Sequence, residues 1–348
     1  MKAIFKREFK SFFHNMTGPI FMAAIFVFMG IYFVAYNVIQ GYPYLTAALS
    51  GMSFILLLTV PILTMRSFAE ERKTKTDQLL LTSPVSVTQI VLGKYAAMVS
   101  VLGICMLISC ILPVVIHFYG GGSLIADYSA IVGFFLLGAA YIAIGMFVSS
   151  LTESQIISAV GTFCILLILQ LTDGIASILP SGAAGSYVCF FLLILAAAAL
   201  LYAMTKNITI AGGFGVICEI ILTILFFVKK SVFGGVFGDF ITSLSLIVRF
   251  DSLLNLTMDF TVFLYYLSVA AVFCFLTVQM IQKRRWSYEV AEHEENQSER
   301  NRFRPEKILP HEKRQVRFLQ LCADRGGHRR SCSIQSGNQP DPGKVYVL

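Results

Sequence analysis

The chain has 348 residues, of which 56% are hydrophobic and only 14% are charged, and its mean hydropathy is +0.74. A soluble domain usually carries about 25% charged residues, so this composition excludes an ordinary soluble enzyme and indicates an integral membrane protein. The formal net charge of +7 is concentrated towards the C-terminal end, because residues 283–348 hold 14 Lys and Arg against 9 Asp and Glu.

Apolar stretches recur along the chain, and each is near the length that crosses a roughly 30 Å hydrocarbon layer as an α-helix. They are continuously apolar and do not alternate, so helices are favoured over a β-barrel. We expect an all-α polytopic membrane fold with about eight transmembrane helices, in a range of six to eight. The expected spans are residues 19–39, 45–65, 96–118, 129–150, 155–172, 187–204, 208–228 and 262–282.

Lys and Arg predict the orientation, because they collect in the cytoplasmic loops of membrane proteins. The basic clusters are residues 2–10, 66–94 and 283–285, which share one side if the number of spans is even. The turns without Lys or Arg are residues 40–44, 119–128 and 173–186. We therefore expect a multi-pass protein of the cell membrane with both termini in the cytoplasm. Lys229 and Lys230 are exceptions, since they fall on the outer side.

One segment between two expected spans is rich in charge, and we call residues 61–95 the elbow. Its charged residues are interleaved with Phe68 and followed by three leucines, a pattern typical of a helix lying at the membrane surface. Ser83 and Pro84 predict a helix that begins there, with Ser as the N-cap and Pro at the first helical position. An ordered elbow and a merely solvated charged face remain alternatives on spacing alone.

The elbow sequence LTMRSFAEERKTKTDQLLLTSPVSVTQIVLGKY resembles the hallmark region of ABC-2 type permeases, especially the gliding-motility-type group. The residues that carry the resemblance are Pro61, Thr64, Met65, Arg66, Glu70, Glu71, Arg72, Thr76, Leu79, Leu80, Leu81, Thr82, Ser83, Pro84, Gly93 and Lys94. Asp77 and Gln78 stand where the family often has Glu before the leucines. The resemblance extends more loosely over residues 1–286, although most members have six spans.

The resemblance implies that the elbow docks on a separate cytosolic ATPase chain and passes its movement to the membrane helices. The residues it assigns to this coupling are Arg66, Phe68, Glu70, Glu71, Arg72, Thr76, Leu79, Leu80, Thr82, Pro84, Gly93 and Lys94. It also implies a second permease subunit, identical or different, contact with membrane lipids, no nucleic acid, and export driven by ATP.

The sequence contains no G-x-x-x-x-G-K-[ST] pattern with which to hold ATP. We therefore expect a transport subunit and not an enzyme, with no catalytic residues, metal or cofactor of its own and with ATP bound by the partner. Two other functions stay open. A membrane-embedded enzyme acting on glycans or lipids would need a polar cluster in an outer loop, where this chain has isolated acids. A non-transport scaffold would use the elbow to bind another partner.

A few residues stand out within the expected spans. Glu219 lies near the middle of residues 208–228, where an ionisable group costs roughly 3 kcal/mol and usually faces protein or water. A neutral carboxyl hydrogen-bonded to a neighbouring helix is the simpler interpretation, and a site on a substrate or proton path is the alternative. Gly138, Gly145 and Ser149 share one side of the fourth span, which predicts close helix packing.

The sequence changes character beyond the seventh expected span. Residues 231–261 mix apolar and charged side chains, which predicts an interfacial or partly re-entrant helix on the outer face. After Trp286 the chain becomes polar and basic, with scattered Pro and Gly. We therefore expect a permease domain over residues 1–286 and a disordered basic tail over residues 287–348. An RNA-binding arm is the alternative for this tail, although no aromatic pattern accompanies its charge.

Overall fold

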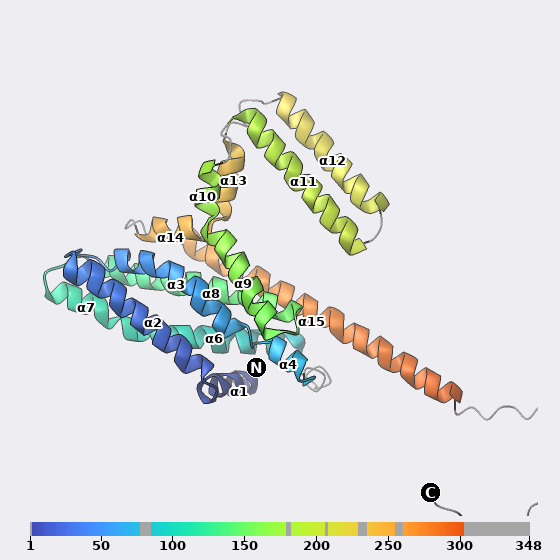
Figure 1. The fold of residues 1–348 in the computed structure, drawn as a ribbon, viewed down its shortest axis with the longest axis horizontal. Coiled ribbons are helices and arrows are strands. Elements are labelled where there is room, and N and C mark those ends of the chain that lie inside the picture. Colours follow the sequence, from blue (N-terminus) through green and yellow to red (C-terminus); the bar gives the residue numbers. More distant parts are fainter. Residues whose placement is uncertain are drawn as a thin grey trace, which may run out of the picture. The chain divides into compact units, whose positions relative to one another are not determined.

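The computed structural model describes residues 2–76, 85–178, 182–205, 208–228, 235–254 and 260–302. Every regular element within these ranges is a helix, as the composition predicts (Figure 1). In chain order the elements are α1 (Lys2–His14), α2 (Thr17–Phe33), the π-helix η1 (Val34–Ile39), α3 (Thr46–Thr64), α4 (Ala69–Lys73), α6 (Val87–Ser109), α7 (Ile111–Phe118), α8 (Leu124–Leu151), α9 (Gln155–Gln170), α10 (Thr172–Ile178), α11 (Ala183–Thr205), α12 (Ile208–Val228), α13 (Val236–Leu244), α14 (Leu246–Leu254) and α15 (Phe260–Arg302). The chain divides into two units, Met1–Ser287 and Tyr288–Leu348.

Helices occur at all eight positions where spans are expected. Within the described ranges, those long and apolar enough to cross a membrane are Thr17–Ile39, Thr46–Lys73, Val87–Phe118, Leu124–Leu151 and Phe260–Arg285. The pair α9 and α10 adds a sixth if it forms one span, bent by 51°. The apolar stretches of α11 and α12 are shorter, residues 183–196 and 215–227. The chain is therefore a multi-pass membrane protein, and eight spans stay a prediction.

Helix α8 lies at the centre of the bundle. In the most apolar stretch of α8, 78% of the residues are buried, whereas in the most apolar stretch of Thr17–Ile39 the buried share is 22%. Helix α8 packs against α3, α6, α9 and α14. A Cβ on Gly138 would lie 2.5 Å from Leu102 Cδ2 of α6, and a Cβ on Gly145 would meet Thr64 of α3. The predicted close packing of the small residues on this helix is confirmed, because larger side chains there would separate α8 from its neighbours.

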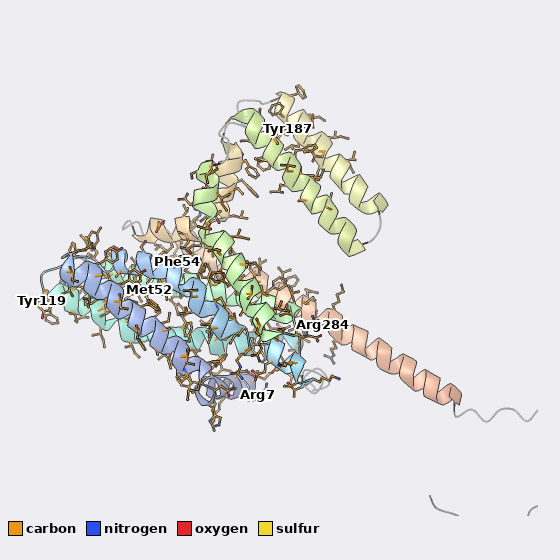
Figure 2. The ribbon with its side chains drawn as sticks, viewed as in Figure 1. Arg7, Met52, Phe54, Tyr119, Tyr187 and Arg284 are labelled. Carbon is orange, nitrogen blue, oxygen red and sulfur yellow. The ribbon has the colours of Figure 1, made fainter. Side chains whose placement is uncertain are left out.

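The three basic segments come together at one end of the bundle. Arg7 Nη2 lies 3.3 Å from Glu71 Oε1 in the elbow, and Arg284 Nη2 donates to Leu151 O over 3.4 Å. At the other end, a Cβ on Gly122 would lie 2.5 Å from Pro43 O, so the two turns free of Lys and Arg are also adjacent. Figure 2 shows Arg7 and Arg284 far from Tyr119. The basic segments therefore lie at one end of the bundle, and the side of the membrane on which this end lies stays a prediction.

The helix that leads out of the elbow begins later than expected. Ser83 and Pro84 predict a start at Pro84, but both lie outside the described residues. The helix that is described, α6, begins at Val87. Ser86 is the residue before it and has an extended backbone, with φ −68° and ψ 140°. An extended residue cannot continue a helix from Pro84 into Val87, so the N-cap position belongs to Ser86.

The tail is not structured as expected over its first part. Helix α15 continues to Arg302 instead of ending near residue 282, so the expected disorder is wrong for residues 287–302. The physical reason is that no Gly or Pro interrupts residues 283–302, which are rich in Glu, Arg and other residues compatible with a helix. Residues 303–348 lie outside the described ranges, and the domain boundary after residue 286 stays a prediction.

The mixed stretch before the last span forms two short helices, α13 and α14. Helix α14 packs against α3, α8 and α9. The Phe250 ring of α14 lies edge-on to Phe134 of α8, 6.1 Å between centroids, and Tyr266 donates a 2.7 Å hydrogen bond to Leu246 O. This segment is therefore attached to the bundle, in agreement with a short re-entrant or interfacial element and not with a further span.

Candidate functional site at the elbow

The first turn of α4 is capped by a side chain from another helix. The N–H groups of Phe68 and Ala69 both donate to Ser149 Oγ of α8, at 3.2 Å each, and Ser149 Oγ donates to Met65 O at 3.3 Å. Helix α4 has no side-chain cap of its own at Phe68. Since the first N–H groups of a helix have no partner within it, Ser149 fixes both the start and the position of α4.

A buried lysine holds the elbow from its other side. Lys94 of α6 is only 3% exposed, and its Nζ donates to Ser67 O at 3.0 Å and to Glu71 Oε1 at 2.8 Å. The same ammonium lies 5.2 Å from the centroid of the Phe68 ring. Phe68 itself is 6% exposed, so the expected packing of this side chain is observed, while its role in coupling stays a prediction.

Two arginines complete the attachment. Arg72 donates to Ser150 O and to Glu153 Oε1, both at 3.1 Å, and so links α4 to the turn between α8 and α9. Arg66 forms a bidentate pair with Glu70, at 2.8 and 2.6 Å. The Arg66–Glu70 pair lies within the elbow, whereas Arg72 binds α8 and the turn that follows it.

The far end of α4 is a closed and exposed turn. Lys75 has φ +56°, the left-handed conformation that often ends a helix. The hydroxyl of Thr74 donates to Glu70 O at 2.9 Å, and that of Thr76 donates to Glu71 O at 3.3 Å. The side chains of residues 73–76 are exposed. The elbow thus presents two lysines and two threonines on a turn whose backbone is already satisfied.

The structure brings most of the predicted elbow residues together. Arg66, Phe68, Glu70, Glu71, Arg72, Gly93 and Lys94 lie within one connected cluster, Thr76 ends it, and Leu79, Leu80, Thr82 and Pro84 lie outside the described residues. Glu71 and Arg72 were expected to face a partner, yet their contacts lie within the chain. Their contact with an ATPase stays a prediction.

Sequence reasoning missed the residues that anchor the elbow. In the sequence Ser149 is recognisable only as a small residue. It caps α4 because the fold brings it next to Phe68 and Ala69, which precede it by 81 and 80 positions. Glu153 likewise pairs with Arg72 across 81 positions. A lone acid directly after a long apolar helix is the one sequence signal that could have pointed to it.

Glu219 lies apart from the elbow, on α12, which packs against α11. Both carboxyl oxygens are covered by protein atoms and have no hydrogen-bond partner among the described residues. A mostly apolar cavity of about 480 Å³ lies beside it, lined by residues of both helices. The side chain therefore faces protein, whereas a role on a substrate or proton path stays a hypothesis. No group of three His, Cys, Asp or Glu side chains in the described part of the chain could hold a metal ion.

Comparison with known proteins finds one family model that matches this part of the chain. A family model described as ABC-2 family transporter protein matches residues 5–184, slightly more than half of the 348 residues. The match covers α1 to α10 and includes the whole elbow. A search of curated proteins found no match.

Proposed function

Because this chain belongs to the ABC-2 family of transporter proteins, we propose that it is the membrane-spanning subunit of an ATP-driven exporter. In this proposal a separate cytosolic ATPase chain binds and hydrolyses ATP, and the elbow receives its movement. A second permease subunit completes the path across the cell membrane, and both termini lie in the cytoplasm with the elbow.

The observation that carries the proposal is the attachment of the elbow to the spans. Ser149 of α8, Lys94 of α6 and Glu153 of the α8–α9 turn all bond to the short segment from Ser67 to Arg72. A charged face that was only solvated would not need a buried lysine, which is costly unless paired. An elbow fixed in this way can pass a displacement to several spans at once.

The exposed turn of residues 73–76 supports contact with a separate chain. It lies at the basic end of the bundle, which the positive-inside rule places in the cytoplasm. Its lysines have no ion-pair partner among the described residues, in contrast to Arg66 and Arg72. Basic side chains that are free in this way suit an acidic surface on the ATPase, which would speed association.

Transport and ATP hydrolysis measured together test the proposal. We expect an ATPase chain to copurify with the wild-type protein and its activity to be coupled to transport in reconstituted membranes. Phe68→Ala should leave the ATPase bound but lower the amount transported per ATP, because the elbow loses the packing that transmits its movement. The loss corresponds to a coupling free energy of about 0.5–2 kcal/mol.

Phe54→Ala is the matched control. Phe54 lies on α3, next in the chain to the elbow, but its side chain is 49% exposed (Figure 2). Its removal takes away the same ring without touching the elbow, so transport per ATP should stay at the wild-type value. If Phe68→Ala also transports like wild type, the elbow does not couple and the proposed mechanism is wrong.

A further inference from the structure

Four charged side chains form a closed ring at the elbow. Arg7 Nη2 lies 2.7 Å from Glu8 Oε1 and 3.3 Å from Glu71 Oε1, while Lys94 Nζ lies 3.3 Å from Glu8 Oε1 and 2.8 Å from Glu71 Oε1. Each charge therefore contacts both charges of opposite sign, and the ring is neutral. Its members come from three elements, since Arg7 and Glu8 belong to α1, Glu71 to α4 and Lys94 to α6.

Lys94 is the innermost member of the ring. Its side chain is 3% exposed, whereas those of Glu8, Glu71 and Arg7 are 14%, 19% and 56% exposed. An ammonium removed from water is stable only when anions and acceptors surround it. The three donors of Lys94 face Glu8, Glu71 and Ser67 O. This set is complete only when α1 and the elbow are both seated on α6.

The neighbouring glycine shows how closely α1 approaches. A Cβ on Gly93 would lie 3.0 Å from Ile4 Cγ2 and 3.6 Å from the backbone nitrogen of Phe5. Glycine thus lets the backbone of α1 pack directly on α6. Gly93 and Lys94 therefore form one contact site for α1, because Gly93 allows the close approach of its backbone and Lys94 pairs with the carboxylate of Glu8.

We propose that Lys94 is a positioning residue that joins α1 to the elbow, so that the two move as one body. The functional consequence rests on the proposed function: displacement of the elbow by an ATPase also displaces α1. Helix α1 packs against α2 and leads into it through a turn of two residues. The movement then reaches the first span as well as the spans that hold the elbow directly.

Hydrogen exchange of the purified full-length protein in lipid nanodiscs tests the link without an ATPase. Glu8→Gln removes the ion pair of α1 with Lys94 and leaves the Lys94–Glu71 pair in place. We expect amide exchange in residues 4–12 to become about tenfold faster, because α1 opens locally more often once this ion pair is lost, with exchange in α4 unchanged. Lys94→Met removes both links, so exchange should rise in α1 and α4 together.

Arg66→Met is the matched control, because Arg66 is another paired cation of the elbow but bonds only to Glu70 among the contacts described above. Exchange in α1 should keep its wild-type rate in this variant. The proposal is overturned if Glu8→Gln leaves α1 at the wild-type rate. It is also overturned if the increase extends equally into α8, since that would show a general loss of stability. Should Lys94→Met fail to fold, Glu8→Gln still decides the question.

The amount transported per ATP hydrolysed is a second measurement. A contact with a purely structural role would leave it unchanged. In reconstituted membranes Glu8→Gln should keep the copurified ATPase bound and hydrolysing, while transport per ATP falls about threefold or more. An unchanged ratio, together with faster exchange in α1, would overturn the functional part of the proposal. If no ATPase associates with the wild type, the proposed function fails, whereas the exchange experiment still decides whether Lys94 joins α1 to the elbow.

Discussion

The start of α4 depends on Ser149, a side chain of another helix. Its Oγ accepts from the N–H groups of Phe68 and Ala69, and the residue is 0% exposed. Water cannot take over these bonds at a fully buried position, and a buried N–H left without a partner costs its full desolvation free energy. One hydroxyl group therefore holds the first turn of α4 on α8, while Arg72 binds Ser150 O of the same helix further along.

We expect Ser149→Ala to lower the free energy of unfolding by about 1–3 kcal/mol, because two buried N–H groups lose their acceptor. The thermal unfolding midpoint of the purified protein measures this change. Ser100→Ala is the control, since Ser100 Oγ donates only to Ala96 O within its own helix at 2.7 Å, and its loss should cost less than about 0.5 kcal/mol. Equal midpoints for the two variants would show that Ser149 does not hold the elbow.

Local sequence patterns predicted which elbow residues belong together but not which atoms they meet. The Arg66–Glu70 pair is visible in the sequence, because residues four apart face each other on a helix. The Glu71–Lys94 and Arg72–Glu153 contacts join residues 23 and 81 positions apart. A charge whose partner is distant in sequence looks free in the sequence alone. The expectation that Glu71 and Arg72 face an ATPase came from the family resemblance and stays a prediction.

The α11–α12 hairpin carries its polar groups between its two helices. Tyr187 of α11 and Thr223 of α12 share a hydrogen bond of 3.1 Å, and Thr223 Oγ1 also donates to Glu219 O at 2.7 Å. Large apolar side chains such as Leu192 and Ile221 are exposed, at 57% and 55%. This arrangement suits a hairpin surrounded by lipid, since a polar group facing hydrocarbon would be costly.

Glu219 tests whether this hairpin has a partner beyond the described residues. Its carboxyl oxygens have none among them, so Glu219→Leu should leave the thermal unfolding midpoint unchanged or raise it, because it removes an unpaired polar group. Thr223→Val should lower the midpoint, since it breaks the bond to Tyr187. A lower midpoint for Glu219→Leu, with Glu219→Gln tolerated, would reveal a hydrogen-bond partner in the assembled transporter.

The positions of the helices were predictable, whereas their ends were not. Long apolar runs fix where a chain can enter a bilayer, and the structure has a helix at each such run. Ser83 and Pro84 predict a helix start, but α6 begins at Val87 after Ser86, whose backbone is extended, and its first turns are buried, with Ile90 1% and Lys94 3% exposed. Tertiary packing of this kind leaves no periodic signal in a single sequence.

The return of the chain to one end limits the number of spans. Arg7, Glu71, Leu151 and Arg284 lie at the same end of the bundle, so each passage between consecutive members of this set must cross the membrane an even number of times. Five spans are excluded by this argument, and six or eight remain. The difference is whether α11 and α12 cross the bilayer or lie beside it.

Cysteine labelling from outside the cell decides between six and eight spans. On a background without the native cysteines, Tyr119→Cys should be labelled, because this residue is 90% exposed and lies at the end opposite Arg7 and Arg284 (Figure 2). Thr74→Cys in the exposed turn of the elbow should be protected.

Asn207→Cys, between α11 and α12, is the deciding position. We expect protection there, since eight spans place it on the cytoplasmic side with Lys206, where basic residues are favoured. Labelling of position 207 with the other two results unchanged would instead establish six spans, with the hairpin on the outer side of the membrane.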